Sequence, residues 1–279
     1  MWIKLNGIKD PIAFDGVPAL VPVLRQVLRG WTVSVVKKGR GTPKIRMSAG
    51  PRGYERRSPW IEGADALGFM DPVDAACDLL LDIERAYVGE AKKLLLLHAA
   101  GVKIGAGIVV FPSTHASGKS LLSVALAHAG YRIIADDQLP LVPGTPALGV
   151  APGFLPRLRR PLPNSLDPRL DDFIRSHPGP LNAKFRYVDV PPDGLAPLGE
   201  RAPITGLVVL NRAAGAKPII ETLGEAETLK ACVLQNFGRT LNALEVLDHL
   251  HAMVKGAECL KLTYDTVGEA VALLQEKFA

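Results

Sequence analysis

Three consecutive residues, Gly118-Lys119-Ser120, join a β-branched apolar segment to a segment with helical apolar spacing. Backbone N–H groups and the helix dipole at such a junction favour an anion. A lysine there neutralises the β- and γ-phosphates of a nucleotide, and a serine hydroxyl ligates Mg²⁺. These residues therefore predict a site for ATP and Mg²⁺. The predicted nucleotide-binding loop comprises Ser113, Thr114, His115, Ala116, Ser117, Gly118, Lys119 and Ser120.

This loop departs from the phosphate-loop pattern Gly-x-x-x-x-Gly-Lys-Ser/Thr at its first position. Ser113 stands where the pattern has a glycine, which permits a tight turn that side chains resist. His115 occupies the middle of the loop, and we expect it to face solvent. A Gly-Lys-Ser triplet arises by chance in roughly one chain in ten of this length. The loop alone therefore leaves two alternatives, a phosphate-binding loop and an ordinary capped helix.

Two adjacent carboxylates, Asp136 and Asp137, follow the predicted strand Tyr131–Ala135. At the carboxyl end of a strand beside a phosphate loop, a carboxylate can hold Mg²⁺ or accept a hydroxyl proton. Paired acidic residues after a strand more often form a solvated turn. Here an apolar continuation, Leu139-Pro140-Leu141, makes a purely solvated pair less natural. The pair therefore favours phosphoryl transfer.

A wider block of residues surrounds the two motifs. It contains Leu97-His98-Ala99, Gly105, Gly107, Ser117-Gly118-Lys119-Ser120, Gly130-Tyr131-Arg132 and Ala135-Asp136-Asp137. His98 lies fifteen residues before Ser113, and Asp136 lies seventeen after Lys119. In residue types and spacing the block resembles the catalytic domain of the HPr serine kinase/phosphorylase family. The resemblance implies an α/β fold with a core like that of HPr kinase and phosphoenolpyruvate carboxykinase, built on a mixed or mostly antiparallel sheet around the phosphate loop.

The resemblance also implies roles for individual residues. Asp136 would be the base that accepts the proton of the acceptor hydroxyl, with His98 beside it, and Lys119 would bind phosphate. Ser120 and Asp137 would hold Mg²⁺. The expected activity is transfer of the γ-phosphoryl group of ATP to a serine of a peptide or protein. Divergent relatives of this kind modify serine in ribosomal peptides, and the family forms homo-oligomers.

The Glu-Ile-Arg-Gly motif of the family, which supplies a further metal-binding carboxylate and serves the reverse reaction, has no clear match. The corresponding residues 153–160 carry Arg157, Arg159 and Arg160 instead. We therefore expect a kinase without phosphorylase activity, and an acceptor other than HPr. Arg157 and Arg159, with Lys184 and Arg186 of a predicted strand, are candidates for contacting the phosphate or an acidic acceptor. The alternative is a solubilising loop.

Two other functions stay open. A small-molecule kinase would use the same phosphate site, because the acceptor pocket cannot be located in the sequence. A nucleotide-binding regulatory protein without catalysis would tolerate the degenerate Ser113. The intact Lys119, Ser120, Asp136 and Asp137 argue against that second alternative.

The elements that position these residues follow from the apolar patterns. Residues 1–92 form a predicted accessory α+β region for substrate recognition, and residues 93–279 a predicted catalytic domain. Predicted strands cover 31–37, 43–47, 94–99, 108–111, 131–135, 206–210, 217–221 and 260–264. Predicted helices begin at Asp71-Pro72 and cover 118–128, 226–235, 240–255 and 267–278. The proline-rich residues 140–203 predict loops more than regular structure.

Composition limits the class of protein. A formal charge of +5 with only 6% aromatic residues gives little support to nucleic-acid binding. Three scattered cysteines, Cys77, Cys232 and Cys259, argue against disulfides or a zinc site. The apolar runs are too short to span a membrane, and the start of the chain lacks the pattern of a signal peptide. We expect a cytoplasmic protein with no membrane partner.

Overall fold

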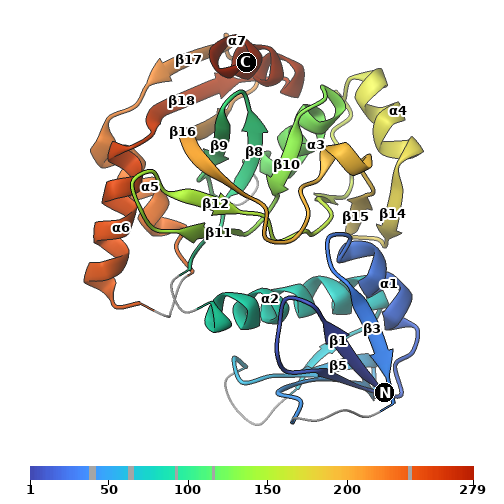
Figure 1. Ribbon diagram of the computed structural model, residues 1–279. Helices are drawn as coiled ribbons and strands as arrows, with labels where there is room; N and C mark the ends of the chain where they lie inside the picture. The colour runs from blue at the N-terminus through green and yellow to red at the C-terminus, as the bar shows by residue number, and fades with distance from the viewer. Residues whose placement is uncertain (38–41, 62–65, 92–93, 115–116, 238–240) are drawn as a thin grey trace.

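The computed structural model describes residues 1–37, 42–61, 66–91, 94–114, 117–237 and 241–279. His115 and Ala116, two of the predicted nucleotide-binding residues, lie outside these ranges. The described residues fold into a mixed α/β structure with three sheets, in agreement with the predicted α/β class (Figure 1). Within the described residues, no helix is both long and apolar enough to cross a membrane.

The N-terminal region forms a six-stranded sheet with the order β3-β1-β2-β4-β5-β6. Helices α1 (Leu20–Val27) and α2 (Pro72–Glu90) belong to the same region, and α2 lies between this sheet and the rest of the chain (Figure 1). The strands are β1 (Trp2–Leu5), β2 (Ile12–Asp15), β3 (Val33–Val36), β4 (Ile45–Gly50), β5 (Gly53–Arg57) and β6 (Leu67–Phe69).

Helix α2 begins where the sequence predicted. The Asp71 carboxylate accepts hydrogen bonds from the N–H groups of Val73 and Asp74, and Pro72 occupies the first helical position. The predicted strands at 31–37 and 43–47 appear as β3 and β4. Helix α1 was not predicted. Its Pro22 lies in the first turn, where backbone N–H groups make no intrahelical hydrogen bond, so a proline is tolerated there.

The larger sheet has nine strands, with the path β10-β8-β9-β16-β12-β11-β7 and with β18 joining β16 to β17. Only β9–β16 and β16–β18 pair in parallel, so the sheet is mixed and mostly antiparallel, as expected. Its strands are β7 (Leu95–Leu97), β8 (Ala100–Ile104), β9 (Gly107–Phe111), β10 (Arg132–Ala135), β11 (Leu139–Val142), β12 (Leu148–Val150), β16 (Arg201–Arg212), β17 (Ile219–Thr222) and β18 (Glu258–Tyr264).

Helices cover both faces of this sheet, because alternate residues of each central strand point to opposite sides. In β9, Ile108 and Val110 pack with α5 (Glu225–Leu234) and α6 (Ala243–Lys255). Val109 and Phe111 pack with α3 (Lys119–His128) and α7 (Val267–Phe278). All four helices lie close to their predicted positions. The phosphate-loop candidate therefore starts from a strand that is buried on both faces.

Residues 140–203 contain more regular structure than predicted. They include β12, β13 (Arg157–Arg159), α4 (Pro168–Ser176), β14 (Pro178–Leu181), β15 (Phe185–Val188) and a short 3₁₀ turn (Pro192–Gly194). Loops and turns still make up more than half of this segment, as predicted, but several prolines begin elements instead of interrupting them. Pro168 follows the N-cap Asp167 of α4, and Pro178 starts β14. Strands β13, β15 and β14 form a third small sheet.

One buried apolar cluster joins the N-terminal region to the residues around this small sheet. Leu79 and Ile83 of α2 belong to it, together with Leu158 of β13 and Tyr187 of β15. The N-terminal region is thus packed against the part of the chain that carries Arg157. The predicted boundary between residues 92 and 93 falls outside the described residues, and the division into two domains stays a prediction.

Candidate functional site

The loop after β9 leads into α3 through a backbone turn that only glycine accommodates easily. Gly118 has φ +94°, in the left-handed region that side chains disfavour. A Cβ at this position would lie 2.9 Å from Oη of Tyr264. The Tyr264 hydroxyl in turn donates a hydrogen bond of 3.2 Å to the carbonyl of Ser117. Tyr264, at the end of β18, therefore holds the loop in place.

Ser113, the residue that replaces the first glycine of the pattern, has a structural partner. Its side chain is buried, and its Oγ accepts a hydrogen bond of 2.9 Å from the backbone N–H of Leu210 in β16. A glycine could not make this bond. The substitution therefore fastens the start of the loop to the neighbouring strand.

Lys119 is buried and turns toward its own loop. Its Nζ donates to the carbonyls of Ser113 at 2.6 Å and Thr114 at 3.0 Å, and lies 3.2 Å from Nε2 of His98. Burial lowers the pKa of Lys119, whereas the nearby carboxylates of Asp137 and Asp136 raise it. A phosphate group in the loop would compete with the two carbonyls for this ammonium group.

His98 lies between the loop lysine and the second aspartate. Its Nδ1 is 3.4 Å from Oδ1 of Asp137, whose other oxygen is 3.4 Å from the guanidinium of Arg157. The resemblance placed His98 beside Asp136, whereas the ion pair joins it to Asp137. Lys119, His98, Asp137 and Arg157 thus form one continuous chain of polar contacts.

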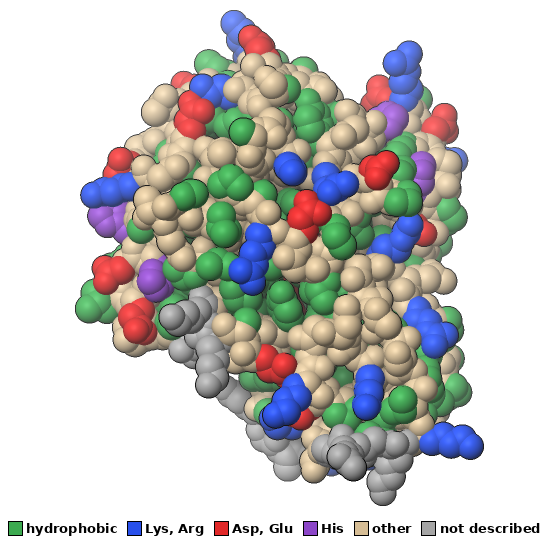
Figure 2. Space-filling view, viewed as in Figure 1, with side chains coloured by type: hydrophobic (Ala, Val, Ile, Leu, Met, Phe, Trp, Pro, Cys, Tyr) green, Lys and Arg blue, Asp and Glu red, His purple; other side chains and the backbone are tan. Residues whose placement is uncertain are grey.

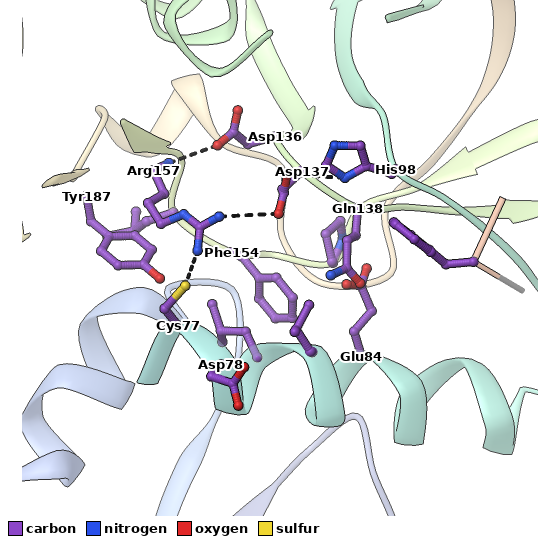
Figure 3. Close-up of a pocket in the computed structure, with 15 residues that line it drawn as sticks. Cys77, Asp78, Glu84, His98, Asp136, Asp137, Gln138, Phe154, Arg157 and Tyr187 are labelled. Carbon is purple, nitrogen blue, oxygen red and sulfur yellow. Dashed lines mark hydrogen bonds and ion pairs between the residues drawn. The ribbon is translucent and has the colours of Figure 1, made fainter. Parts of the chain in front are cut away.

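Asp136 is almost fully buried at the end of β10, with 8% of its surface exposed. The backbone N–H of Arg157 donates to its Oδ2 at 2.9 Å (Figure 3), and Oδ1 has no hydrogen-bond partner among the described residues. Burial raises the pKa of Asp136 to about 6, although the backbone N–H of Arg157 and the nearby Ser120 side chain lower it. A carboxylate with this pKa can accept a proton near neutral pH.

Two cavities meet at His98, Asp137 and Arg157. The first, of about 240 Å³, adjoins Lys119 and Ser120; Arg159 and Arg212 also line it. The second, of about 290 Å³, lies between α2 and the end of β10. Hydrophobic side chains gather around the hollow between the N-terminal region and the larger sheet (Figure 2). The predicted base, Asp136, lines the second cavity.

The other predicted substrate-binding residues lie elsewhere. Lys184 forms an ion pair of 2.7 Å with Asp74, and the Arg186 guanidinium donates to the carbonyl of Ile174 at 2.9 Å. Arg160 donates to the carbonyl of Asn182. None of these three residues lines either cavity. The structure therefore brings Arg157 and Arg159 to the site, but not Lys184 or Arg186.

Mg²⁺ is commonly held by one or two carboxylates together with the phosphates of the substrate and water. Asp137, half-exposed beside the loop, and the hydroxyl of Ser120 fit such a site. Among the described residues, no group of three or more His, Cys, Asp or Glu side chains could hold a metal ion. Any Mg²⁺ here would depend on phosphate oxygens for its remaining ligands.

Two site residues were not predicted from the sequence. Arg212 ends β16 beside the loop, and nothing in its local pattern distinguishes it. Glu84 lines the second cavity, and it did carry a signal. It falls four residues after Leu80 and four before Val88, so an acidic residue interrupts the buried face of α2.

No protein-family model matches the chain, and neither does any curated protein sequence. Among solved structures, the chain is similar to the Hpr(Ser) kinase/phosphatase from Coxiella burnetii. The two are 14% identical, with a TM-score of 0.33, and the match covers 65% of this chain and 96% of the other. The two folds correspond only loosely at this TM-score. The function is therefore argued from the geometry of the site.

Proposed function

We propose that the protein is an ATP- and Mg²⁺-dependent kinase that phosphorylates a serine hydroxyl of a peptide or protein. One observation carries the proposal: the buried carboxyl of Asp136 is close enough to Ser120 of the loop for that side chain to lower its pKa, and it also lines a second cavity. Nucleotide and acceptor can therefore approach the same carboxylate from two sides. Phosphoryl transfer requires this arrangement of positioned base and phosphate-binding loop.

Each site residue has a separate role in the proposed reaction. Lys119 binds the β- and γ-phosphates, and Asp137 with Ser120 holds Mg²⁺, which neutralises charge on the phosphates. Asp136 accepts the proton of the serine hydroxyl while the serine oxygen bonds to the γ-phosphorus. The bond from that phosphorus to the β–γ bridging oxygen breaks, and ADP leaves. Arg157 or Arg159 stabilises the charge of the transferring group.

A small-molecule kinase is the second candidate. The cavity beside Asp136 measures about 290 Å³, which suits one side chain or a compact metabolite equally well. Transfer of label to a free hydroxyl compound, but to no peptide, would favour this alternative.

Incubation with γ-labelled ATP, Mg²⁺ and a serine-containing peptide library tests the proposal. We expect label on serine with the wild-type chain, and a loss of about a hundredfold or more in both Lys119→Ala and Asp136→Asn. Asp248→Asn, an exposed aspartate on α6, is the matched control and should retain activity. Tight Lys119-dependent ATP binding without transfer to any acceptor would favour a regulatory protein. Absence of ATP binding would refute the proposal.

A further inference from the structure

The second cavity has an apolar wall and lies outside the phosphate loop. Leu80 and Leu81 of α2 line one side, and Phe154, Leu155 and Phe237 line the other. The ring of Phe237 meets that of His98 edge-on, with centroids 5.6 Å apart. The N-terminal region thus supplies one wall of a cavity whose other end reaches the predicted catalytic base.

Glu84 is an unusual member of this cavity. It is 1% exposed, and its Oε1 has no hydrogen-bond partner in the described structure. Its side chain points from α2 toward Gln138 and His98 (Figure 3). Burial, and to a lesser extent the charge of Asp137, raises its pKa well above the ordinary value. A buried carboxyl oxygen without a partner is destabilising unless a ligand supplies the missing donor.

The charges around the cavity indicate which kind of donor fits. Among the described residues that line it are four carboxylates, and Arg157 is the one Lys or Arg side chain in that set. The guanidinium of Arg157 already contacts Asp137 and the thiol of Cys77. Asp78 pairs with Arg56 at 2.6 Å. Within the part of the chain that the structure describes, Glu84 is thus left without a cation, and an anionic ligand group would be repelled.

Building on the proposed kinase function, we infer that this cavity is the acceptor pocket and that Glu84 selects an acceptor carrying an ammonium group beside an apolar body. The Glu84 carboxyl gives up its proton to solvent as the ammonium group pairs with it, and the apolar part contacts Leu80, Leu81 and Phe154. The hydroxyl to be phosphorylated then lies at the end of the cavity where Asp136 is found. A lysine close to the target serine has this chemistry.

Binding of a simple probe pair tests the pocket without a known acceptor. Isoamylamine carries an ammonium group at neutral pH, and isoamyl alcohol is a neutral compound of the same shape. Both are titrated into the full chain, and binding is followed by saturation-transfer NMR. We expect the amine to bind at least about tenfold more tightly than the alcohol. In Glu84→Gln the two should bind within about twofold of each other.

Glu90→Gln is the matched control, because it makes the same change at an exposed position of α2 and should keep the preference for the amine. Leu81→Phe narrows the cavity and should weaken both probes. Equal binding of amine and alcohol to the wild type, or a preference that survives in Glu84→Gln, would overturn the inference.

ATP binding by the same preparations separates the two proposals. If the chain does not bind ATP but still prefers the amine in a Glu84-dependent way, the proposed kinase function is refuted and the cation-binding pocket stands. Lys119-dependent ATP binding without an amine preference would retain the nucleotide site and remove Glu84 as the selector.

Discussion

The ammonium group of Lys119 lies 3.2 Å from Nε2 of His98. Because a lysine ammonium can only donate, Nε2 is the acceptor, and the proton of a neutral His98 must be on Nδ1. That proton faces Asp137, whose carboxylate is 3.4 Å away. The histidine therefore connects the predicted phosphate-binding lysine to the predicted Mg²⁺ ligand.

The tautomer of His98 is the first prediction. Nitrogen-15 NMR of the histidine rings at pH 8 should show His98 protonated on Nδ1. Lys119→Met, which removes the donor, should weaken this preference, whereas His249 on α6 should be unaffected. A wild-type His98 protonated on Nε2 would contradict the assignment.

Protonation of Asp136 should make the kinase activity fall at acidic pH. Its pKa is raised to about 6, and a base acts only when ionised, so kcat/KM should rise with pH and level off above about 7. The groups facing Asp136 are Ser120, Asp137 and Arg157. Asp137→Asn removes a neighbouring negative charge and should move the midpoint to lower pH. A midpoint unchanged in Asp137→Asn would exclude Asp136 as the titrating group.

The same carboxyl should make stability depend on pH. Its folded pKa of about 6 exceeds the unfolded value of 3.8, so its contribution is fully present below 3.8 and is lost as pH rises through 6. The loss is about 3 kcal/mol, an order-of-magnitude figure from 1.36 kcal/mol per pKa unit. Asp136→Asn should gain stability over wild type by this amount between pH 4 and 7, measured by urea unfolding. A difference that stays constant with pH would contradict the prediction.

Ser113 should matter for stability through its bond to β16. Ser113→Gly restores the phosphate-loop pattern, but leaves the buried N–H of Leu210 without its partner. We expect a loss of about 1–3 kcal/mol in unfolding free energy. Ser113→Ala should lose a similar amount, since the missing hydroxyl is common to both. Thr114→Ala, at the exposed neighbouring position, should change stability by less than about 0.5 kcal/mol.

Gly118 should tolerate no side chain. In Gly118→Ala the new Cβ meets the Tyr264 hydroxyl, and the residue must keep a φ of +94°. We expect ATP affinity to fall by about tenfold or more, since about 1–2 kcal/mol of backbone strain is added to the clash. Adding Tyr264→Phe removes the clash but not the strain, so it should restore affinity only in part. Full restoration would show that backbone conformation is unimportant here.

Local patterns determined much of the structure around the loop. The β-branched residues of β9, the Gly-Lys-Ser turn and the periodic residues of α3 follow one another closely in the sequence. Local conformational preferences are therefore enough to predict the strand, the turn and the helix. The start of α2 was equally predictable, because Asp71 and Pro72 supply a cap within a single turn. For the same reason, Asp136 and Asp137 could be placed at the end of a strand.

Tertiary packing decided the rest. Prolines predicted loops over 140–203, but their positions at the starts of α4 and β14 became clear only from the sheet that they join. Lys184 and Arg186 suit the site by residue type, yet Asp74 of α2 and the carbonyl of Ile174 bind them instead. Glu84 lines the second cavity only because α2 packs beside the residues that follow β10. Side-chain type and spacing act over a few residues, whereas the partner of a side chain depends on contacts that the whole fold creates.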